Sequence, residues 1–189
     1  MALLTSGKRY GCKDSNGGIK KIYLAAFVPY SRNLFGFDGV LLTSIPTTFV
    51  YAFEMIGDNN SFQQSYDGIG YSQTLNVEFK RQDVDTAIQM QSLNYIELRA
   101  LILDKNDNYL VFGLDNGLTS DSLEILTGNS RSEFNGYRMI FTGKEKHTSP
   151  FVLDPFNNGF IEVDEEDDFY QFQNLEAFMF QNGEQYYFN

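Results

Sequence analysis

The sequence predicts a mainly β protein with one short helix, an α+β chain whose strands form a sandwich or barrel. Two observations support this. The aromatic residues are 18 Phe and 12 Tyr with no Trp, and both types favour pleated surfaces. Short runs of alternating apolar and polar residues recur between turns rich in Gly, Asn and Asp. At 189 residues the chain is long enough to bury a core in a single domain.

The stretch from Tyr95 to His147 predicts a hairpin followed by a third strand. Residues 95–103 alternate and then become fully apolar, which is typical of a strand that starts half-buried and ends wholly buried. Residues 104–108 are rich in Asp and Asn and predict a tight turn, and 109–114 return as the partner strand. We expect the third strand at 135–145, after a long connection in which Leu123, Ile125 and Leu126 form a short strand.

Four further strands are expected earlier in the chain. Residues 18–28 are apolar on both faces, which indicates a central strand covered on both sides. Residues 48–56 form the next strand, and a turn at 57–60 leads to a short return strand at 61–66. Strict alternation over 71–81 predicts a half-exposed strand.

A helix of about ten residues is expected after Asp83, which has the character of an N-cap. Val84, Ala87, Ile88 and Gln91 have the spacing of one helical stripe, and the helix is expected to end near Asn94.

Two segments are candidates for contacts between subunits. The irregular loop at 29–46 carries a Leu-Phe-Gly-Phe stretch, which either packs under the core or is offered to a partner. From residue 152 the chain becomes acidic, aromatic and rich in Gln and Asn, so we divide it into a β domain, 1–151, and a C-terminal arm, 152–189, that packs on its own or a neighbouring subunit. The residues proposed for the subunit interface are Leu34, Phe35, Phe37, Phe169, Tyr170, Phe172, Phe178 and Tyr187.

The formal net charge of -11 argues against a nucleic-acid grip, because phosphate binding needs clustered Lys and Arg. An acidic surface would let DNA pass nearby without specific binding. The alternative is ordinary charge for solubility, and the run from Asp164 to Asp168 is typical of a solvated segment.

Catalytic, cofactor and metal sites are not predicted. His147 is the only histidine and Cys12 the only cysteine, and they lie far apart in the sequence. Asp104, Asn106, Asn108 and Asp115 follow the spacing of a calcium loop, but the sixth position is Tyr109 where that loop needs Gly, so we favour a hairpin turn. We therefore expect no enzyme activity and no cofactor.

The N-terminus lacks the apolar stretch of a signal peptide, and no apolar run approaches the roughly 20 residues that a membrane span needs. We expect a protein made in the cytoplasm, without a membrane anchor.

Several short motifs resemble a family of virion proteins from phages of Bacteroidetes, the crAss-like phages and their relatives. They are Cys12, Gly17–Leu24, Gln73–Leu75, Gly113–Leu118, Asn135–Tyr137, Phe141–Gly143 and Pro150–Phe151. This family is similar to phage tail-tube and tail-ring proteins, which implies a β-sandwich or barrel with one flanking helix. The chain departs from the family pattern at 29–46 and in the arm from Phe151.

The resemblance implies a structural protein of the virion, made in the cytoplasm of the host bacterium. It would form a tail tube, tail ring or neck around the DNA channel, as a hexameric or dodecameric ring that contacts neighbouring tail or neck proteins. The sequence does not identify which acidic residues face the lumen. A capsid-associated decoration or head-fibre protein remains an alternative. A carbohydrate-binding sandwich is a weaker one, because Trp, which commonly stacks on sugars, is absent.

Overall fold

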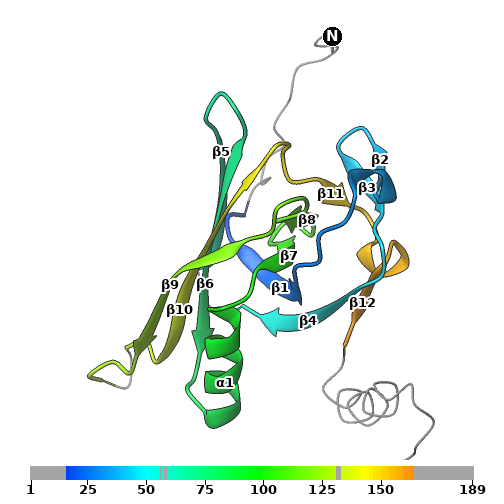
Figure 1. Cartoon of the computed structure of the whole chain (residues 1–189). Helices are drawn as coiled ribbons and strands as arrows, with labels where there is room; N and C mark the ends of the chain where they lie inside the picture. The colour runs from blue at the N-terminus through cyan, green and yellow to red at the C-terminus, as the bar shows by residue number, and fades with distance from the viewer. Residues whose placement is uncertain (1–15, 56, 58, 131–132, 164–189) are drawn as a thin grey trace, which may run out of the picture.

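Period-2 apolar runs form two β-sheets in the computed structural model, which describes residues 16–55, 57, 59–130 and 133–163 (Figure 1). The larger sheet has the strand order β12 (Phe160–Glu162), β4 (Thr48–Glu54), β1 (Ile19–Ala26), β7 (Leu98–Asp104), β8 (Tyr109–Phe112), β11 (Phe151–Val152), β3 (Leu41–Ser44), β2 (Gly36–Asp38). The smaller sheet has the order β5 (Ser61–Tyr66), β6 (Tyr71–Lys80), β10 (Gly136–Glu145), β9 (Thr119–Leu126). The predicted class, mainly β with one short α-helix, is confirmed.

One hydrophobic core lies between the two sheets and a second lies within the curl of the larger sheet. β1 contributes to both: Ile22 and Leu24 face the first core, whereas Tyr23 and Ala25 face the second. The strand lies between β4 and β7, so its predicted central, doubly covered position is confirmed. The second core also contains Phe35, which comes from the loop after β1.

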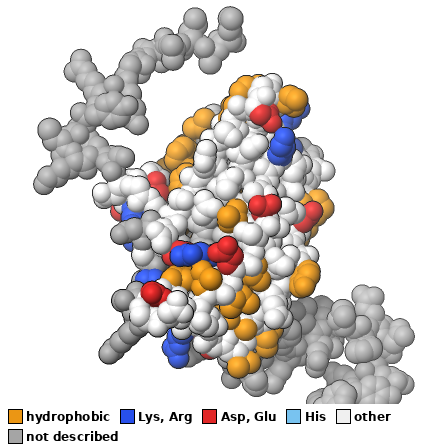
Figure 2. Space-filling view, turned by 90° about the vertical axis from the view of Figure 1, so that its left-hand side faces the viewer, with side chains coloured by type: hydrophobic (Ala, Val, Ile, Leu, Met, Phe, Trp, Pro, Cys, Tyr) orange, Lys and Arg blue, Asp and Glu red, His pale blue; other side chains and the backbone are white. Residues whose placement is uncertain are grey.

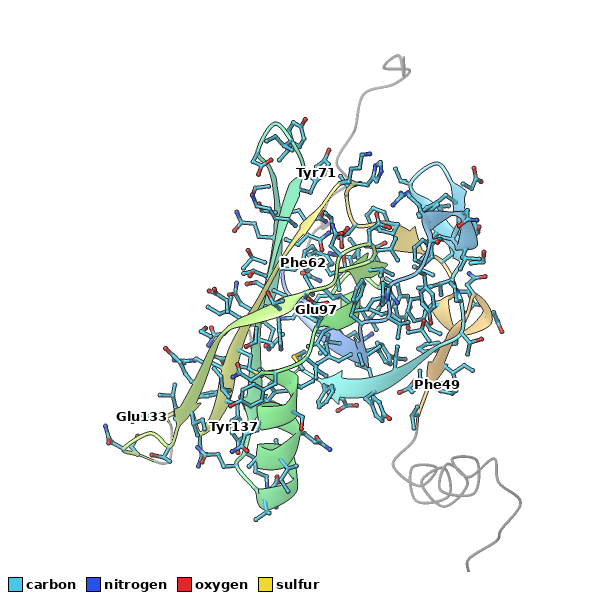
Figure 3. The ribbon with its side chains drawn as sticks, viewed as in Figure 1. Phe49, Phe62, Tyr71, Glu97, Glu133 and Tyr137 are labelled. Atoms are coloured by element: carbon cyan, nitrogen blue, oxygen red, sulfur yellow. The ribbon has the colours of Figure 1, made fainter. Side chains whose placement is uncertain are left out.

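The strand at Ser61–Tyr66 exists as predicted, but it does not return along β4. It pairs with β6 in the smaller sheet over all six residues, whereas β4 pairs with β1 and β12. The crossing between sheets has a packing reason: Phe62 lies edge-on to Phe112 of β8, with ring centroids 5.3 Å apart, and so helps close the space between the layers (Figure 3).

Helix α1 (Val84–Leu93) begins at the predicted N-cap, where the Asp83 side chain accepts a hydrogen bond from the backbone N–H of Thr86 at 2.8 Å. Of the predicted stripe, only Ala87 packs against the core. Val84 and Ile88 are 75% and 61% exposed, and Met90 and Leu93 are buried instead. The helix closes one end of the sandwich, so only the face that carries Met90 and Leu93 reaches the core between the sheets.

β7 also differs from the prediction. The strand begins at Leu98 and all seven residues are buried, whereas Tyr95 and Ile96 precede it and are exposed. Alternation had assigned Arg99 to a half-exposed face, yet its residue exposure is 1%. Both faces of β7 are covered by the two cores, so no strand position faces solvent.

The chain after residue 151 continues the larger sheet. β11, a 3-10 turn η2 (Pro155–Asn157) and β12 follow one another, and β12 pairs in parallel with β4. Val152, Phe160 and Val163 are buried in or beside the second core. Residues 152–163, assigned to the arm on sequence grounds, therefore pack on this chain's own sheet. The rest of the arm lies outside the described residues.

Candidate functional site

The surface that we treat as the candidate site is the η1 segment, residues 29–38, which follows β1 and includes the 3-10 turn η1 (Arg32–Leu34) and β2. Of the three interface residues predicted here, Leu34 is 55% exposed and Phe37 is 37% exposed. Phe35 is buried, 6.2 Å from the Tyr30 ring and 6.3 Å from the Phe37 ring. Phe35 thus anchors the segment from below, and Leu34 and Phe37 carry its apolar surface.

Arg99 fixes the base of the η1 segment. Its Nη2 donates to the carbonyl oxygens of Val28 and Leu114, at 3.0 and 2.9 Å. Nε and Nη1 have no hydrogen-bond acceptor, but the guanidinium lies 5.0 Å from the ring centroid of Phe27, 5.3 Å from that of Tyr30 and 6.0 Å from that of Phe35. These π faces stabilise a desolvated cation. Burial lowers the pKa of the Arg99 guanidinium, which nevertheless remains protonated.

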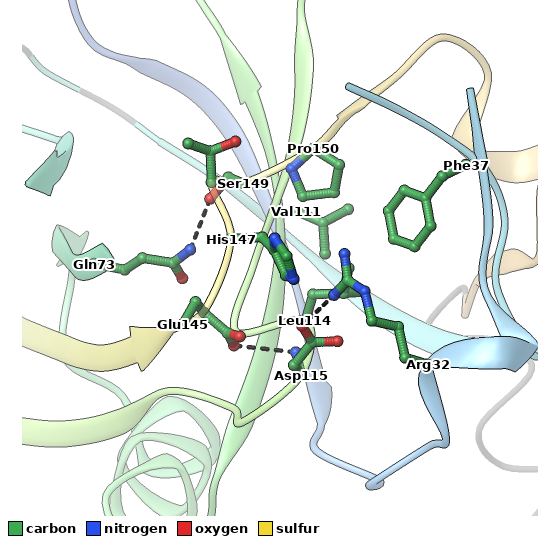
Figure 4. Close-up of a pocket in the computed structure, with 11 residues that line it drawn as sticks. Arg32, Phe37, Gln73, Val111, Leu114, Asp115, Glu145, His147, Ser149 and Pro150 are labelled. Atoms are coloured by element: carbon green, nitrogen blue, oxygen red, sulfur yellow. Dashed lines mark hydrogen bonds and ion pairs between the residues drawn. The ribbon is translucent and has the colours of Figure 1, made fainter. Parts of the chain in front are cut away.

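The loop between β8 and β9, residues 113–118, is held against the η1 segment by two buried side chains of the smaller sheet (Figure 4). Gln73 Oε1 accepts from the N–H of Gly113 at 2.9 Å, and Glu145 Oε1 accepts from the N–H groups of Asp115 and Asn116 at 3.1 and 2.9 Å. Burial raises the pKa of Glu145, and the two N–H donors act in the opposite direction.

Gly117 lets this loop pass close to Phe27, which lies between β1 and the η1 segment. Its φ of +77° suits glycine, and a Cβ at this position would lie 2.9 Å from the Phe27 ring. The loop then presents Asp115 to Arg32 in an ion pair, and the Arg32 guanidinium also lies 4.7 Å from the centroid of the Phe37 ring. A continuous set of contacts therefore runs from Glu145 through Asp115 and Arg32 to the exposed ring of Phe37.

A small cavity lies among these side chains, with His147, Ser149 and Pro150 on its opposite wall (Figure 4). Its volume of about 10 Å³ has room for about one water molecule and none for an organic substrate. Ser149 Oγ accepts from Gln73 Nε2 at 2.9 Å, and no hydrogen bond joins His147 to a serine or carboxylate among the described residues. The cluster has the residue types of a hydrolase but not the geometry of one.

A more open depression of about 460 Å³ lies on the outer face of the smaller sheet, between β6 and the β9–β10 connection. Its carboxylate, Glu78, accepts from Arg138 Nε at 2.7 Å and from Asn59 Nδ2. Arg138 in turn lies 4.8 Å from the centroid of the Phe134 ring. Glu78 is therefore already paired, and the described residues that line this depression include no serine, threonine or cysteine.

The calcium-like spacing resolves into a turn. Both Asn106 and Asn108 donate their backbone N–H to Asp104 Oδ1 at 2.8 Å, while Asp115 lies in the next loop with Arg32. Within the described ranges, no three His, Cys, Asp or Glu side chains gather closely enough to hold a metal ion. In the same part of the chain, no helix has the length and apolar character that a bilayer span requires.

The structure brings together Leu34, Phe35 and Phe37 on one segment. The other predicted interface residues, Phe169, Tyr170, Phe172, Phe178 and Tyr187, lie outside the described residues. Sequence reasoning missed Arg99, Gln73 and Glu145, which position this segment. A charged residue inside the apolar run at 98–103 was the available signal for Arg99, since a buried cation requires dedicated partners.

Comparison with known proteins adds no relative: no protein-family model, curated protein or solved structure matches the chain.

Proposed function

We propose that the chain is a structural subunit of a phage virion that assembles into a ring or tube, as a tail tube, tail ring or neck through which DNA passes. The observation that carries this proposal is the η1 segment. It presents Leu34 and Phe37 to solvent on a backbone that Arg99 and Phe35 hold in place. Exposed apolar side chains on a preorganised segment are typical of an interaction surface, because little ordering entropy remains to be lost on binding.

The charge distribution supports the same proposal. Residues 164–189 contain seven Asp and Glu and no Lys or Arg, so they contribute -7 of the net charge of -11. A strongly acidic segment repels nucleic acid, which suits a conduit that DNA crosses without binding. The proposed mechanism involves no bond chemistry: the assembled subunits form a conduit and their charge keeps DNA from binding. The subunits are joined head to tail, so that the η1 segment of one contacts a different surface of the next.

The test is the assembly state of the purified chain, measured by native mass spectrometry and negative-stain imaging. We expect rings or tubes of six or twelve subunits. Leu34→Asp combined with Phe37→Asp should abolish them, because two carboxylates would be desolvated in the contact. The matched control is Ile69→Asp, at a site that is 92% exposed on the β5–β6 turn and lies outside the η1 segment, and it should leave the rings intact.

Truncation after Val163 tests the arm separately, because the variant keeps every described strand and helix, the last of which is β12. Loss of rings in this variant alone would assign the ring contact to residues 164–189 and not to the η1 segment. A chain that remains a monomer or trimer under all conditions contradicts the ring proposal and favours the capsid decoration protein.

A further inference from the structure

In the part of the chain that the structure describes, the two sheets have four edge strands, and three of them carry features that oppose pairing with another chain. β2 and β12 have only three residues each, and β2 also has a register shift at Gly36. β9 has eight residues but carries Asp121 and Glu124 and has a register shift opposite Ile140. Short length, charge and bulges are the usual protections of an exposed edge.

β5 has none of these protections. Its sequence, Ser-Phe-Gln-Gln-Ser-Tyr, has no charged residue and no proline. It pairs with β6 over six consecutive residues without a register shift, and among the described residues β6 is its only strand partner. Its far side therefore presents backbone N–H and C=O groups in a regular array, which is a template for a further strand. Figure 2 views the molecule from the side of the smaller sheet, where uncharged polar side chains and backbone, drawn in white, cover much of the surface between separate charged and hydrophobic groups.

We propose that β5 pairs antiparallel with β5 of a second copy, so that the two smaller sheets join into one sheet of eight strands. Side-chain direction restricts the register. Opposed residues must lie on the same face of the joined sheet. One residue must therefore face its own copy across the twofold axis, which cannot lie level with the midpoint between two successive residues. In a strand of six residues, five residues of each copy are opposed if either Gln63 or Gln64 faces its own copy across the axis.

The axis at Gln64 is favoured by the side chains. It places Phe62 opposite Tyr66 of the second copy, and Gln63 opposite that copy's Ser65. Tyr66 is 63% exposed in the single chain, although it already lies 5.1 Å from the Tyr71 ring. The new contact would cover it with a second aromatic ring, and such cross-strand aromatic pairs contribute favourably to sheet pairing. No like charges meet in this register.

This contact is isologous, whereas the ring contact proposed above is head to tail, and the two do not depend on each other. Where both form, two rings join through paired β5 strands, which doubles the subunit number. The interface is small, so the isolated contact should be weak and depend on protein concentration.

The experiment uses the Leu34→Asp, Phe37→Asp background to remove rings, and measures mass by light scattering across a concentration series. We expect a monomer–dimer equilibrium. Adding Gln63→Lys and Ser65→Lys opposes lysines across the axis and should give a monomer at every concentration. The matched control adds Thr119→Lys and Ile125→Lys on the opposite edge strand β9, and it should still dimerise.

Charge exchange makes the test independent of any loss of folding. A third variant with Gln63→Glu and Ser65→Glu should also be monomeric alone, and mixing it with the lysine variant should restore dimers that contain one copy of each. A monomeric background, a lysine variant that still dimerises, or a mixture that stays monomeric would each overturn the proposal. A background that still forms rings contradicts the role of the η1 segment only, and the mixing experiment is then made with the chain truncated after Val163.

Discussion

The Glu145 carboxylate provides the sharpest test of how the η1 segment is held. Its Oε1 accepts both N–H groups at the start of the β8–β9 loop, and the residue is only 3% exposed. Glu145→Ala removes the acceptor of two part-buried donors, and water can reach the one that belongs to the exposed residue Asn116. A buried donor without an acceptor costs about 1–3 kcal/mol, and because water can replace part of what is lost here, we expect the free energy of unfolding to fall by about 1–3 kcal/mol.

Glu145→Gln separates the hydrogen bonds from the charge. The amide keeps an oxygen where Oε1 lies, so both bonds persist, while the cost of burying a negative charge disappears. Because burial raises the pKa of Glu145 in the folded state, the folded chain binds a proton more readily than the unfolded chain. The ionised group therefore weakens the wild type as the pH rises through the folded-state pKa, and this penalty is absent below the unfolded-state value.

The assay is urea unfolding of the wild type and both variants at pH 4 and pH 7. The free energies are compared only if the three proteins have the same m-value, the slope of the unfolding free energy against urea concentration. At pH 7, Glu145→Gln should be at least as stable as the wild type. The wild type should gain on this variant as the pH falls, and Glu145→Ala should be the least stable at both values. If Glu145→Gln loses as much stability as Glu145→Ala, the two backbone hydrogen bonds do not hold the loop.

Three further predictions concern Arg99, Asp67 and Asp83. Arg99→Met removes the hydrogen bonds to Val28 and Leu114, and should speed tryptic cleavage after Arg32 severalfold because the η1 segment loses its anchor; unchanged cleavage would contradict that role. Asp67 accepts from the N–H groups of Gly70 and Ile69 and pairs with Lys144, which lowers its pKa to about 2. Its contribution is therefore present above its usual pKa and lost as the pH falls toward 2, so the melting temperature of Asp67→Asn should lie below that of the wild type at pH 6 and match it near pH 2, as followed by circular dichroism. Asp83→Ala removes the helix cap and should cost about 0.5–2 kcal/mol in urea unfolding, whereas Asp83→Ser should cost much less.

The elements that the sequence predicted well are those whose signal is local. The alternation in β6, the Asp83 cap and the Asp104 turn all depend on neighbouring residues, and the structure contains each of them. Strand partners were less accessible, because pairing of β5 with β6 instead of β4 depends on how Phe62 packs across the layers. Long-range packing of this kind leaves no periodic trace.

The candidate site was predictable only in part. The Leu-Phe-Gly-Phe stretch was recognisable as an apolar loop, and the structure adds that Phe35 is buried while Leu34 and Phe37 are exposed. The supporting side chains of Gln73, Arg99 and Glu145 come from strands at least 35 residues away in the sequence, and no local pattern links them to the η1 segment. Arg99 was recognisable as a charge inside an apolar run, but its acceptors and those donors that Glu145 binds became identifiable only once the strands were placed against each other.

The parallel pairing of β12 with β4 has a consequence for biosynthesis. Phe160 lies opposite Thr48, so this part of the larger sheet joins residues 112 positions apart in the chain. At a synthesis rate of about 5–20 residues per second, β12 is made about 6–22 seconds after β4. During that time the outer edge of β4 and the exposed ring of Phe49 have no strand beside them. On a polysome, neighbouring nascent copies can therefore pair with one another through the open edge of β4. Pairing of β12 with β4 ends this period of exposure.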